Sequence, residues 1–273
     1  MERALAFLCC LGVALGAGTP KDIREVLIAR CNAFQGNSAV KDAYGSSWKK
    51  RDCSKVADDF IQGFKNNNRC GVPDNAFDKV IQSAMQPMLP NKMTLWSGVH
   101  AQSKVLAKAE GLFTLEMGTL LGHMGDGLTF CGKKTPPGID YASCPKWGEC
   151  TSGGKDAVGV FWPAISKALA TMARGVVRAL LNGSGKCGRL PFRDESICAS
   201  IELVYLNPKQ VTKLEVLLVH LPGEKVVETC ATGASIKSMK ARVEKKGIAF
   251  SCIDDPKPIH DILCKGSPGA KGC

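Results

Sequence analysis

The chain has 273 residues, of which 45% are apolar and 22% are charged, and its formal net charge at pH 7 is +11. These proportions are typical of a folded globular protein and exclude disordered, collagen-like and coiled-coil chains. The 14 cysteines are unusual, because a reducing cytosol gives a protein little use for so many thiols unless they bind metal.

The first 18 residues predict a secretory signal peptide. A short charged start leads into a nearly wholly apolar run from Ala4 to Leu15, and the small residues Gly16, Ala17 and Gly18 follow. A buried N-terminal helix is the alternative. No later stretch of the sequence reaches the roughly 18 uncharged apolar residues of a membrane span. We therefore expect a mature protein without a membrane span, secreted or held in the lumen of a vesicle or granule.

The first half of the mature chain has the pattern of a helical domain. Apolar residues recur there at helical spacing, with polar residues between them. The stretches with this spacing are Lys21–Phe34, Cys53–Phe64 and Ala76–Met85, and a later one is Asp156–Met172.

The second half contains short apolar runs bounded by Gly, Pro or Asn, which predict buried strands. Between the last two runs, residues Ala234–Lys246 have helical spacing and end at Gly247, a residue type favoured after helix C termini. Strand, helix and strand at this spacing indicate a right-handed parallel crossover, and hence a small α/β domain. The predicted strands are Lys92–Trp96, Val176–Leu181, Ser200–Leu206, Lys213–Leu221 and Ile248–Cys252.

Disulfides are the expected state of the cysteines that remain after the signal peptide, with Cys9 and Cys10, is removed. A zinc site needs clustered ligands, whereas the sequence has no Cys-x-x-Cys motif and its four histidines lie far apart, so no metal is expected. Spacing alone does not choose among the pairings. The remaining cysteines are Cys31, Cys53, Cys70, Cys131, Cys144, Cys150, Cys187, Cys198, Cys230, Cys252, Cys264 and Cys273.

The basic residues occur in short runs spread over the chain, such as Lys49–Arg51 and Lys245–Lys246, with few aromatic residues nearby. Nucleic-acid-binding proteins usually concentrate such charge on one element, so no nucleic-acid partner is expected. A solvated basic surface would instead attract anionic ligands.

One acidic residue lies in an unusual setting. In the predicted strand Ser200–Leu206, alternation places Glu202 on the same face as Val204 and Leu206. A carboxylate on an apolar face is costly unless it is paired or functional. An edge strand with Glu202 in water is the alternative.

Other candidates are less specific. Trp96 and Trp162 each lie at or near the end of an apolar run, and each is either part of a core or a platform for a ligand. Glu116 and Asp126 lie beside apolar runs, where caps and surface residues are also common. Asn182 begins the only N-glycosylation sequon, Asn182-Gly-Ser184.

Taken together, these residues lie in segments that resemble the ADP-ribosyl cyclase (cyclic ADP-ribose hydrolase) family of NAD-consuming ectoenzymes. The resemblance extends over essentially the whole mature chain and keeps its order. The matching segments are Val26–Cys31, Leu95–Gly98, Phe113–Glu116, Thr119–Gly122, Leu128–Gly132, Ser143–Trp147, Val160–Trp162, Leu180–Ser184, Ser200–Glu202, Val211–His220 and Ala249–Cys252.

The resemblance implies a disulfide-rich α+β or α/β fold with an active-site cleft between two domains. A helical N-terminal domain would contain residues 19–89 and 114–173, and a C-terminal domain with a small parallel sheet flanked by helices would contain residues 90–113 and 174–273. A homodimer is also suggested. The pairs implied are Cys31–Cys53, Cys70–Cys150, Cys131–Cys144, Cys230–Cys252 and Cys264–Cys273. Cys187 and Cys198 are left over, and we predict that they bond to each other.

The resemblance makes Glu202 the catalytic glutamate and overturns the edge-strand alternative. Trp96 and Trp162 match the pair that holds nicotinamide and guides the folded nucleotide. The chemistry fits, because nicotinamide leaves NAD as a neutral base and needs no general acid, unlike the alkoxide of a glycosidase substrate. NAD and NADP are then substrates, and no cofactor is implied.

Further roles follow from the same resemblance. Glu116 matches an acidic residue that touches the nicotinamide amide and influences whether cyclisation or hydrolysis prevails. Asp126 matches a second acidic residue of the cleft. Ser97 and Ser166 match polar positions near the phosphates and ribose.

The sequence also departs from the family pattern. Met117 and Gly118 replace a single Asp after Glu116, and Cys198-Ala199 replaces a Phe-Gly pair before Glu202. The missing aromatic side chain would loosen the grip on adenine and disfavour cyclisation. Two alternatives remain: a catalytically weak member that acts as a secreted binding or signalling protein, and an unrelated disulfide-rich secreted protein with a polyanionic partner.

Overall fold

The computed structural model describes residues 22–146, 149–150, 154–184, 189–266, 269–270 and 273. The predicted signal peptide and Cys187 lie outside the described residues. Two compact units are present, each formed by two separate stretches of chain. The helical unit contains residues 22–87 and Glu116–Leu169, and the sheet unit contains Met88–Leu115 and Ala170–Cys273.

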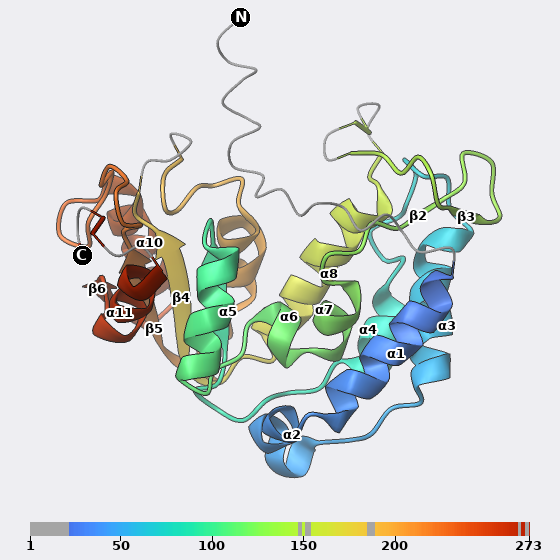
Figure 1. Ribbon diagram of the computed structural model, residues 1–273, viewed down its shortest axis with the longest axis horizontal. Helices are drawn as coiled ribbons and strands as arrows, with labels where there is room; N and C mark the ends of the chain where they lie inside the picture. Colours follow the sequence, from blue (N-terminus) through green and yellow to red (C-terminus); the bar gives the residue numbers. More distant parts are fainter. Residues whose placement is uncertain (1–21, 147–148, 151–153, 185–188, 267–268, 271–272) are drawn as a thin grey trace, which may run out of the picture. The chain divides into compact units, whose positions relative to one another are not determined.

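The helical unit consists of helices and one antiparallel strand pair (Figure 1). Its four predicted helices are confirmed as α1, α3, α4 and α8, but the pattern does not reveal the shorter helices. In chain order the elements are α1 (Ile23–Gly36), α2 (Ser38–Tyr44), the 3-10 turn η1 (Gly45–Ser47), α3 (Cys53–Lys65), α4 (Asp78–Ala84), α6 (Leu115–Gly118), α7 (Leu120–Gly125), β2 (Cys131–Gly132), β3 (Ile139–Asp140) and α8 (Ala157–Thr171).

Five buried phenylalanines form the core of the helical unit. The ring centroid of Phe60 in α3 lies 5.0 Å from that of Phe130 and 4.9 Å from that of Phe161 in α8. Phe64 and Phe77 complete the cluster, and none of the five is more than 1% exposed. Burial of one such side chain stabilises the fold by roughly 1.5–3 kcal/mol. This packing fixes the rotation of α8 about its axis.

The sheet unit is built on four parallel strands in the order β1–β4–β5–β6. Four of the five predicted strands are confirmed. The strands are β1 (Thr94–Ser97), β4 (Gly175–Asn182), β5 (Val211–Val219) and β6 (Ala249–Asp254), and the helices are α5 (His100–Ala109), the π-helical turn η2 (Cys198–Glu202), α9 (Leu203–Tyr205), α10 (Ala234–Lys245) and α11 (Lys257–Gly266).

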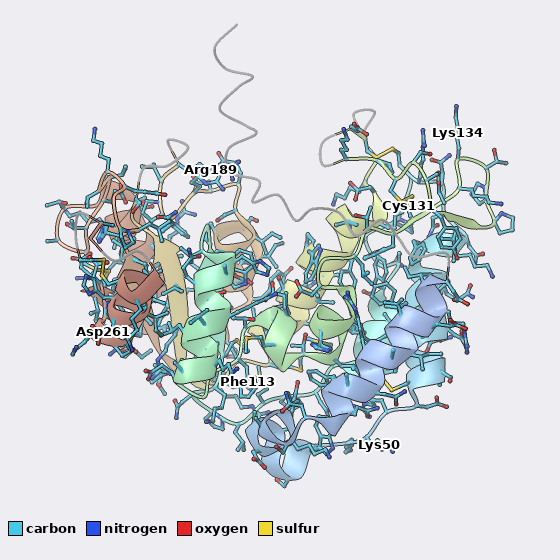
Figure 2. The ribbon with its side chains drawn as sticks, in the orientation of Figure 1. Lys50, Phe113, Cys131, Lys134, Arg189 and Asp261 are labelled. Carbon is cyan, nitrogen blue, oxygen red and sulfur yellow. A yellow bond between two sulfur atoms is a disulfide. The ribbon has the colours of Figure 1, made fainter. Side chains whose placement is uncertain are left out.

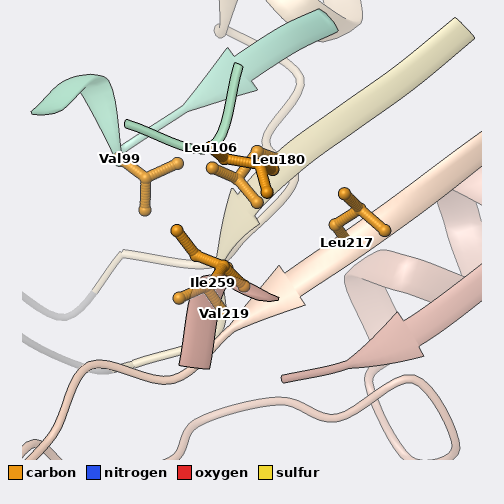
Figure 3. Close-up of a cluster of buried hydrophobic side chains, with 6 residues drawn as sticks. All are labelled: Val99, Leu106, Leu180, Leu217, Val219 and Ile259. Atoms are coloured by element: carbon orange, nitrogen blue, oxygen red, sulfur yellow. The ribbon is translucent and has the colours of Figure 1, made fainter. Parts of the chain in front are cut away.

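Both faces of this sheet are covered. On one face, side chains of β4 and β5 pack against α5 and α11, and Figure 3 shows this cluster of Val99, Leu106, Leu180, Leu217, Val219 and Ile259. The alternate residues of β5, Val216 and Leu218, are also fully buried. Burial on both faces explains why the C-terminal halves of the two strands, residues 179–181 of β4 and 216–219 of β5, are continuously apolar.

The predicted helix between β5 and β6 is confirmed as α10. It ends where Gly247 adopts a φ of 80°, and the two strands that it joins are parallel. No helix of the described residues is long and apolar enough to cross a membrane.

The predicted strand over residues 200–206 is wrong, because this segment is helical. The π-helical turn η2 contains Glu202 as its last residue, and α9 continues from it. Ser196 begins the helical path: its side-chain oxygen accepts a hydrogen bond from the amide of Ala199 at 3.2 Å, and its carbonyl accepts one from the amide of Ser200 at 2.9 Å. Residues 198, 199, 202, 203 and 206 are buried, which is helical spacing rather than alternation.

The five disulfides implied by the resemblance are confirmed: Cys31–Cys53, Cys70–Cys150, Cys131–Cys144, Cys230–Cys252 and Cys264–Cys273. Cys131, labelled in Figure 2, lies in β2 and is held there to the segment that follows β3. Cys31–Cys53 joins α1 to the first residue of α3. The helical unit is therefore cross-linked at several points.

The predicted bond between Cys187 and Cys198 is not supported. Cys198 is a free thiol that is only 2% exposed. Its side chain is directed into the interior beside Glu202, where burial removes it from the reach of an external thiol. Cys187 itself is not among the described residues.

Candidate active site

Glu202 is buried, with 6% of its surface exposed. Its carbonyl accepts a hydrogen bond from the amide of Leu206 at 3.1 Å, and the amide of the next residue, Leu203, donates to the carbonyl of Cys198. Both bonds fix the backbone of the turn that carries the carboxylate. π-helical turns occur frequently at functional sites. The alternative of a solvated Glu202 on an edge strand is therefore excluded by both its burial and its helical setting.

Cys198 lies one turn before Glu202. Burial raises the pKa of the Cys198 thiol well above its usual range, and the charge of the Glu202 carboxylate raises it further. The thiol therefore stays protonated at neutral pH and is not a reactive thiolate. In this position it is a small apolar neighbour of the glutamate.

The turn η2 packs against β1, which carries Trp96 and Ser97. The indole of Trp96 rests against the buried cluster of Figure 3, and its ring centroid is 4.8 Å from that of His100. Ser97 is the last residue of β1. Glu202, Trp96 and Ser97 therefore belong to segments that meet near the carboxyl ends of parallel strands, where α/β sheets usually bind ligands.

Gly98 makes a tight turn directly after β1. Its φ is +74°, and a Cβ there would lie 3.2 Å from the Cβ of Asn182. The side-chain amide of Asn182 donates to the Gly98 carbonyl at 3.4 Å, and its oxygen accepts from the amide of Ser184 at 2.8 Å. The sequon residue Asn182 thus ends β4 beside the end of β1. Its glycosylation stays a prediction.

Trp162 and Ser166 lie in α8 of the helical unit. They are four residues apart and therefore share one face of the helix. Trp162 is partly buried and packs edge-on against Phe161, with 5.1 Å between ring centroids, whereas Ser166 is only 2% exposed. Since Phe161 belongs to the phenylalanine core, that core sets the direction of the Trp162 side chain.

Glu116 lies in the short helix α6 and is 5% exposed. The turn that follows Glu116 is held by two hydrogen bonds. The hydroxyl of buried Tyr44 donates to the Gly118 carbonyl at 2.5 Å, and the side chain of Thr119 accepts from the Gly122 amide at 3.0 Å to begin α7. Tyr44, which sequence reasoning missed, therefore holds the turn that follows Glu116.

Asp126 follows the last residue of α7. Its carbonyl accepts a hydrogen bond from Arg30 Nη1 at 2.6 Å, and the same nitrogen donates to the Met124 carbonyl at 3.0 Å. A cation at the C terminus of a helix is favourable, because it satisfies carbonyls that lack partners within the helix. Arg30 of α1 therefore sets the backbone at Asp126.

The candidate residues fall into two groups, one in each unit. The sheet unit holds Glu202, Trp96 and Ser97, and the helical unit holds Glu116, Asp126, Trp162 and Ser166. Within the described ranges, the structure contains no cluster of three or more His, Cys, Asp or Glu residues that would bind a metal ion.

A hydrogen-bond network centred on His220 connects the ends of β4 and β5 to the segments that contain Glu228 and Asp255. His220 Nδ1 lies 2.7 Å from Asp255 Oδ2, and His220 Nε2 lies 2.8 Å from the Glu228 carbonyl. Both partners are acceptors, so a protonated imidazole, which donates from both ring nitrogens, satisfies both of them. The Gly183 carbonyl accepts from the amides of Val227 and Glu228, which ties the end of β4 to the same network.

The stability of the protein is expected to depend on the charge of His220. Burial, the largest influence, lowers the pKa of His220, but the Glu228 carbonyl and the charges of Asp255 and Asp254 outweigh it and raise the pKa above the usual 6.5. Because the pKa of His220 is higher in the folded than in the unfolded state, the protonated ring stabilises the fold. This stabilisation is fully present below about pH 6.5 and is lost as the pH rises through the pKa of the folded state. Denaturant unfolding at several pH values checks this.

In the wild type, the free energy of unfolding should therefore decrease as the pH rises through that range. In His220→Gln, the decrease that comes from the loss of the His220 proton should be absent. His260→Gln is the matched control, because it leaves the pair of His220 and Asp255 intact. An unchanged pH dependence in His220→Gln would show that the network contributes nothing.

Comparison with known proteins places these features in a family. Residues 20–273 match the family model described as ADP-ribosyl cyclase. The chain is 28% identical over 278 residues to the ADP-ribosyl cyclase/cyclic ADP-ribose hydrolase of Aplysia californica, covering 99% of this chain and 95% of that protein. It is 30% identical over 260 residues to ADP-ribosyl cyclase/cyclic ADP-ribose hydrolase 1 of Rattus norvegicus, covering 94% and 81%.

Solved structures agree. The Aplysia cyclase in complex with substrate NGD and product cGDPR has a TM-score of 0.81 and 29% identity, covering 92% of this chain and 96% of that one. Porcine CD38 in complex with a covalent intermediate has a TM-score of 0.75 and 30% identity, covering 88% and 98%. The family model covers residues 20–273, which include both units, and the chain is a member of the ADP-ribosyl cyclase family.

Proposed function

We propose that this protein cleaves the bond between nicotinamide and ribose in NAD(P) and releases nicotinamide with cyclic ADP-ribose, ADP-ribose or both. The observation that carries the proposal is the buried carboxylate of Glu202 on a helical turn packed against the strand that bears Trp96. Membership in the family supports it, as do the complexes of the Aplysia cyclase with NGD and cGDPR and of porcine CD38 with a covalent intermediate.

The chemistry needs few groups. When the C1′–N bond breaks, its electron pair goes to the nicotinamide nitrogen, which becomes neutral, so no proton has to be delivered to the leaving group. The ribosyl carbon becomes cationic, and the carboxylate of Glu202 stabilises it or bonds to it. The face of an indole suits the cationic pyridinium of the substrate, which is the role of Trp96 and Trp162.

The acceptor decides the product. Adenine N1 of the same molecule gives cyclic ADP-ribose, water gives ADP-ribose, and a free pyridine base gives base exchange. Glu116 contacts the nicotinamide amide and influences this choice, and Asp126 is a second acidic residue that binds the substrate. Ser97 and Ser166 lie near the phosphates and ribose. Cys198 and Ala199 provide no aromatic surface for adenine, so we expect hydrolysis to compete strongly with cyclisation.

The setting of the enzyme belongs to the same proposal. The protein is secreted or stored in a vesicle or granule lumen after loss of its signal peptide, with Asn182 glycosylated, and it forms a homodimer. Its disulfides support an oxidising compartment, because such bonds persist there and are rare in the cytosol.

Product analysis tests the function. The mature protein, with its disulfides formed, is incubated with NAD or NADP, and the products are separated by HPLC. We expect nicotinamide in an amount equal to the sum of the cyclic and linear ADP-ribose products, which keep the 2′-phosphate when NADP is the substrate. A correctly disulfide-bonded protein that releases no nicotinamide would contradict the proposal and favour a binding or signalling role for an inactive family member.

A further inference from the structure

The helical segment that carries Glu202 ends abruptly. Only three residues of α9 follow the glutamate, and Leu206 has already left the helical conformation, with a ψ of 124°. The last carbonyls of a helix have no amide partners within it. In so short a segment, partners from elsewhere in the fold decide how firmly its final turn is held.

Lys246 supplies those partners. Its Nζ atom donates to the Leu203 carbonyl at 2.7 Å and to the Val204 carbonyl at 2.6 Å. These are the carbonyls of the two residues directly after Glu202. A cation at this end also opposes the partial negative charge of a helix C terminus. Neither partner atom belongs to the carboxylate, so Lys246 acts through the backbone.

The backbone of Lys246 is itself held in place. It follows the last residue of α10, and its amide bonds to the carbonyls of Glu244 and Val243. Val243 and Met239 of α10 are buried in the sheet unit. The lysine therefore connects a well-packed helix to the short segment of the glutamate across about 40 residues of chain.

We propose that Lys246 is a positioning residue for the reaction, which holds the turn of Glu202 in place through the carbonyls of Leu203 and Val204. The inference rests on the proposed function, because it takes Glu202 as the catalytic group. A misplacement of about 1 Å in a catalytic group costs roughly 10²-fold in rate. Loss of the two hydrogen bonds, which lie one and two residues away from Glu202, would allow a movement of that size.

Steady-state kinetics of nicotinamide release test the proposal with three variants. Lys246→Met keeps the length of the side chain but removes the ammonium, and Lys246→Arg keeps a cationic donor. Lys245→Met is the matched control, because Lys245 is exposed and immediately precedes Lys246. We expect Lys246→Met to lower kcat roughly 10- to 100-fold with little change in KM. Lys246→Arg should recover most of the loss, and Lys245→Met should behave as the wild type.

Hydrogen exchange supplies a readout that needs no activity. The amide of Leu206 is bonded to the Glu202 carbonyl, and we expect it to exchange about tenfold faster in Lys246→Met than in the wild type, at a temperature where both are folded. Unchanged exchange and unchanged kcat in Lys246→Met would overturn the inference. A fall in kcat that Lys246→Arg does not recover, with unchanged exchange, would also overturn it.

Different results would contradict the proposed role of Glu202 and the proposed role of Lys246. If Glu202→Gln is inactive and Lys246→Met equals the wild type, only the inference about Lys246 is wrong. If Glu202→Gln releases nicotinamide at the wild-type rate, the role of Glu202 is wrong, and the inference about Lys246 is wrong with it.

Discussion

Replacing Glu202 with glutamine is expected to reduce the rate of nicotinamide release from NAD by roughly 10³-fold. Glutamine has the same shape and fits the same buried site, but it removes the negative charge that stabilises the ribosyl cation. The neutral amide also forms no ribosyl ester. Initial rates of nicotinamide release by HPLC, compared at saturating NAD, measure the effect.

The control for this variant is Glu195→Gln, which makes the same change at an exposed position of the same segment. It should keep the wild-type rate. Thermal unfolding of both variants shows whether the fold is intact, and we expect melting temperatures close to that of the wild type. A Glu202→Gln protein within tenfold of the wild-type rate would contradict the assignment of Glu202.

Gly132→Ala is expected to destabilise the helical unit by about 3 kcal/mol or more. A Cβ at Gly132 would overlap the carbonyl oxygen of Asn67 and would lie 2.5 Å from that of Phe64. Both obstacles are backbone atoms, which do not rotate away as a flexible side chain does. Because β2 is also held by the disulfide of Cys131, the strand has little freedom to shift. Thermal unfolding should show a loss of roughly 6–12 °C in Tm.

The matched control is Gly36→Ala at the end of α1, where a Cβ would meet no atom within 4 Å. Alanine favours helices over glycine by up to about 1 kcal/mol, so this variant should melt at or slightly above the wild-type temperature. If Gly132→Ala melted together with Gly36→Ala, the close approach of β2 to the end of α3 would be wrong.

Long periodic segments of the fold are predictable from the sequence, and the segment of Glu202 shows where the prediction fails. The helices α1, α3 and α10 repeat their apolar face over several turns, and the C-terminal halves of β4 and β5 are apolar on both faces. The run from Ser200 to Leu206 is too short to distinguish the helical period of about 3.6 residues from the strand period of about 2 residues. Extending the window back to Cys198 reveals helical spacing, and Ser196 then supplies the start of the helix.

The candidate site could not be read from local pattern. Trp96, Trp162, Glu116 and Asp126 are ambiguous on their own, because what distinguishes a ligand platform from a core residue is its neighbours in space. The disulfides likewise depend on partners that are distant in the chain. The resemblance implies the roles and the five pairs, but it implies no partner for Cys198, and the bond predicted between Cys198 and Cys187 is not supported.

The order β1–β4–β5–β6 has a consequence for the way the chain folds. The strands β4, β5 and β6 follow one another within a single stretch, and each pairs with the next in sequence. In the chain, β1 is separated from β4 by residues 116–169, which form the second stretch of the helical unit. The two strands therefore pair across a long insertion. Contacts across such separations form slowly, because the entropy of closing the loop must be overcome first. We therefore expect the edge that carries Trp96 and Ser97 to be the last part of the sheet to assemble, so that catalytic competence would come at the end of folding rather than with the first stable strands.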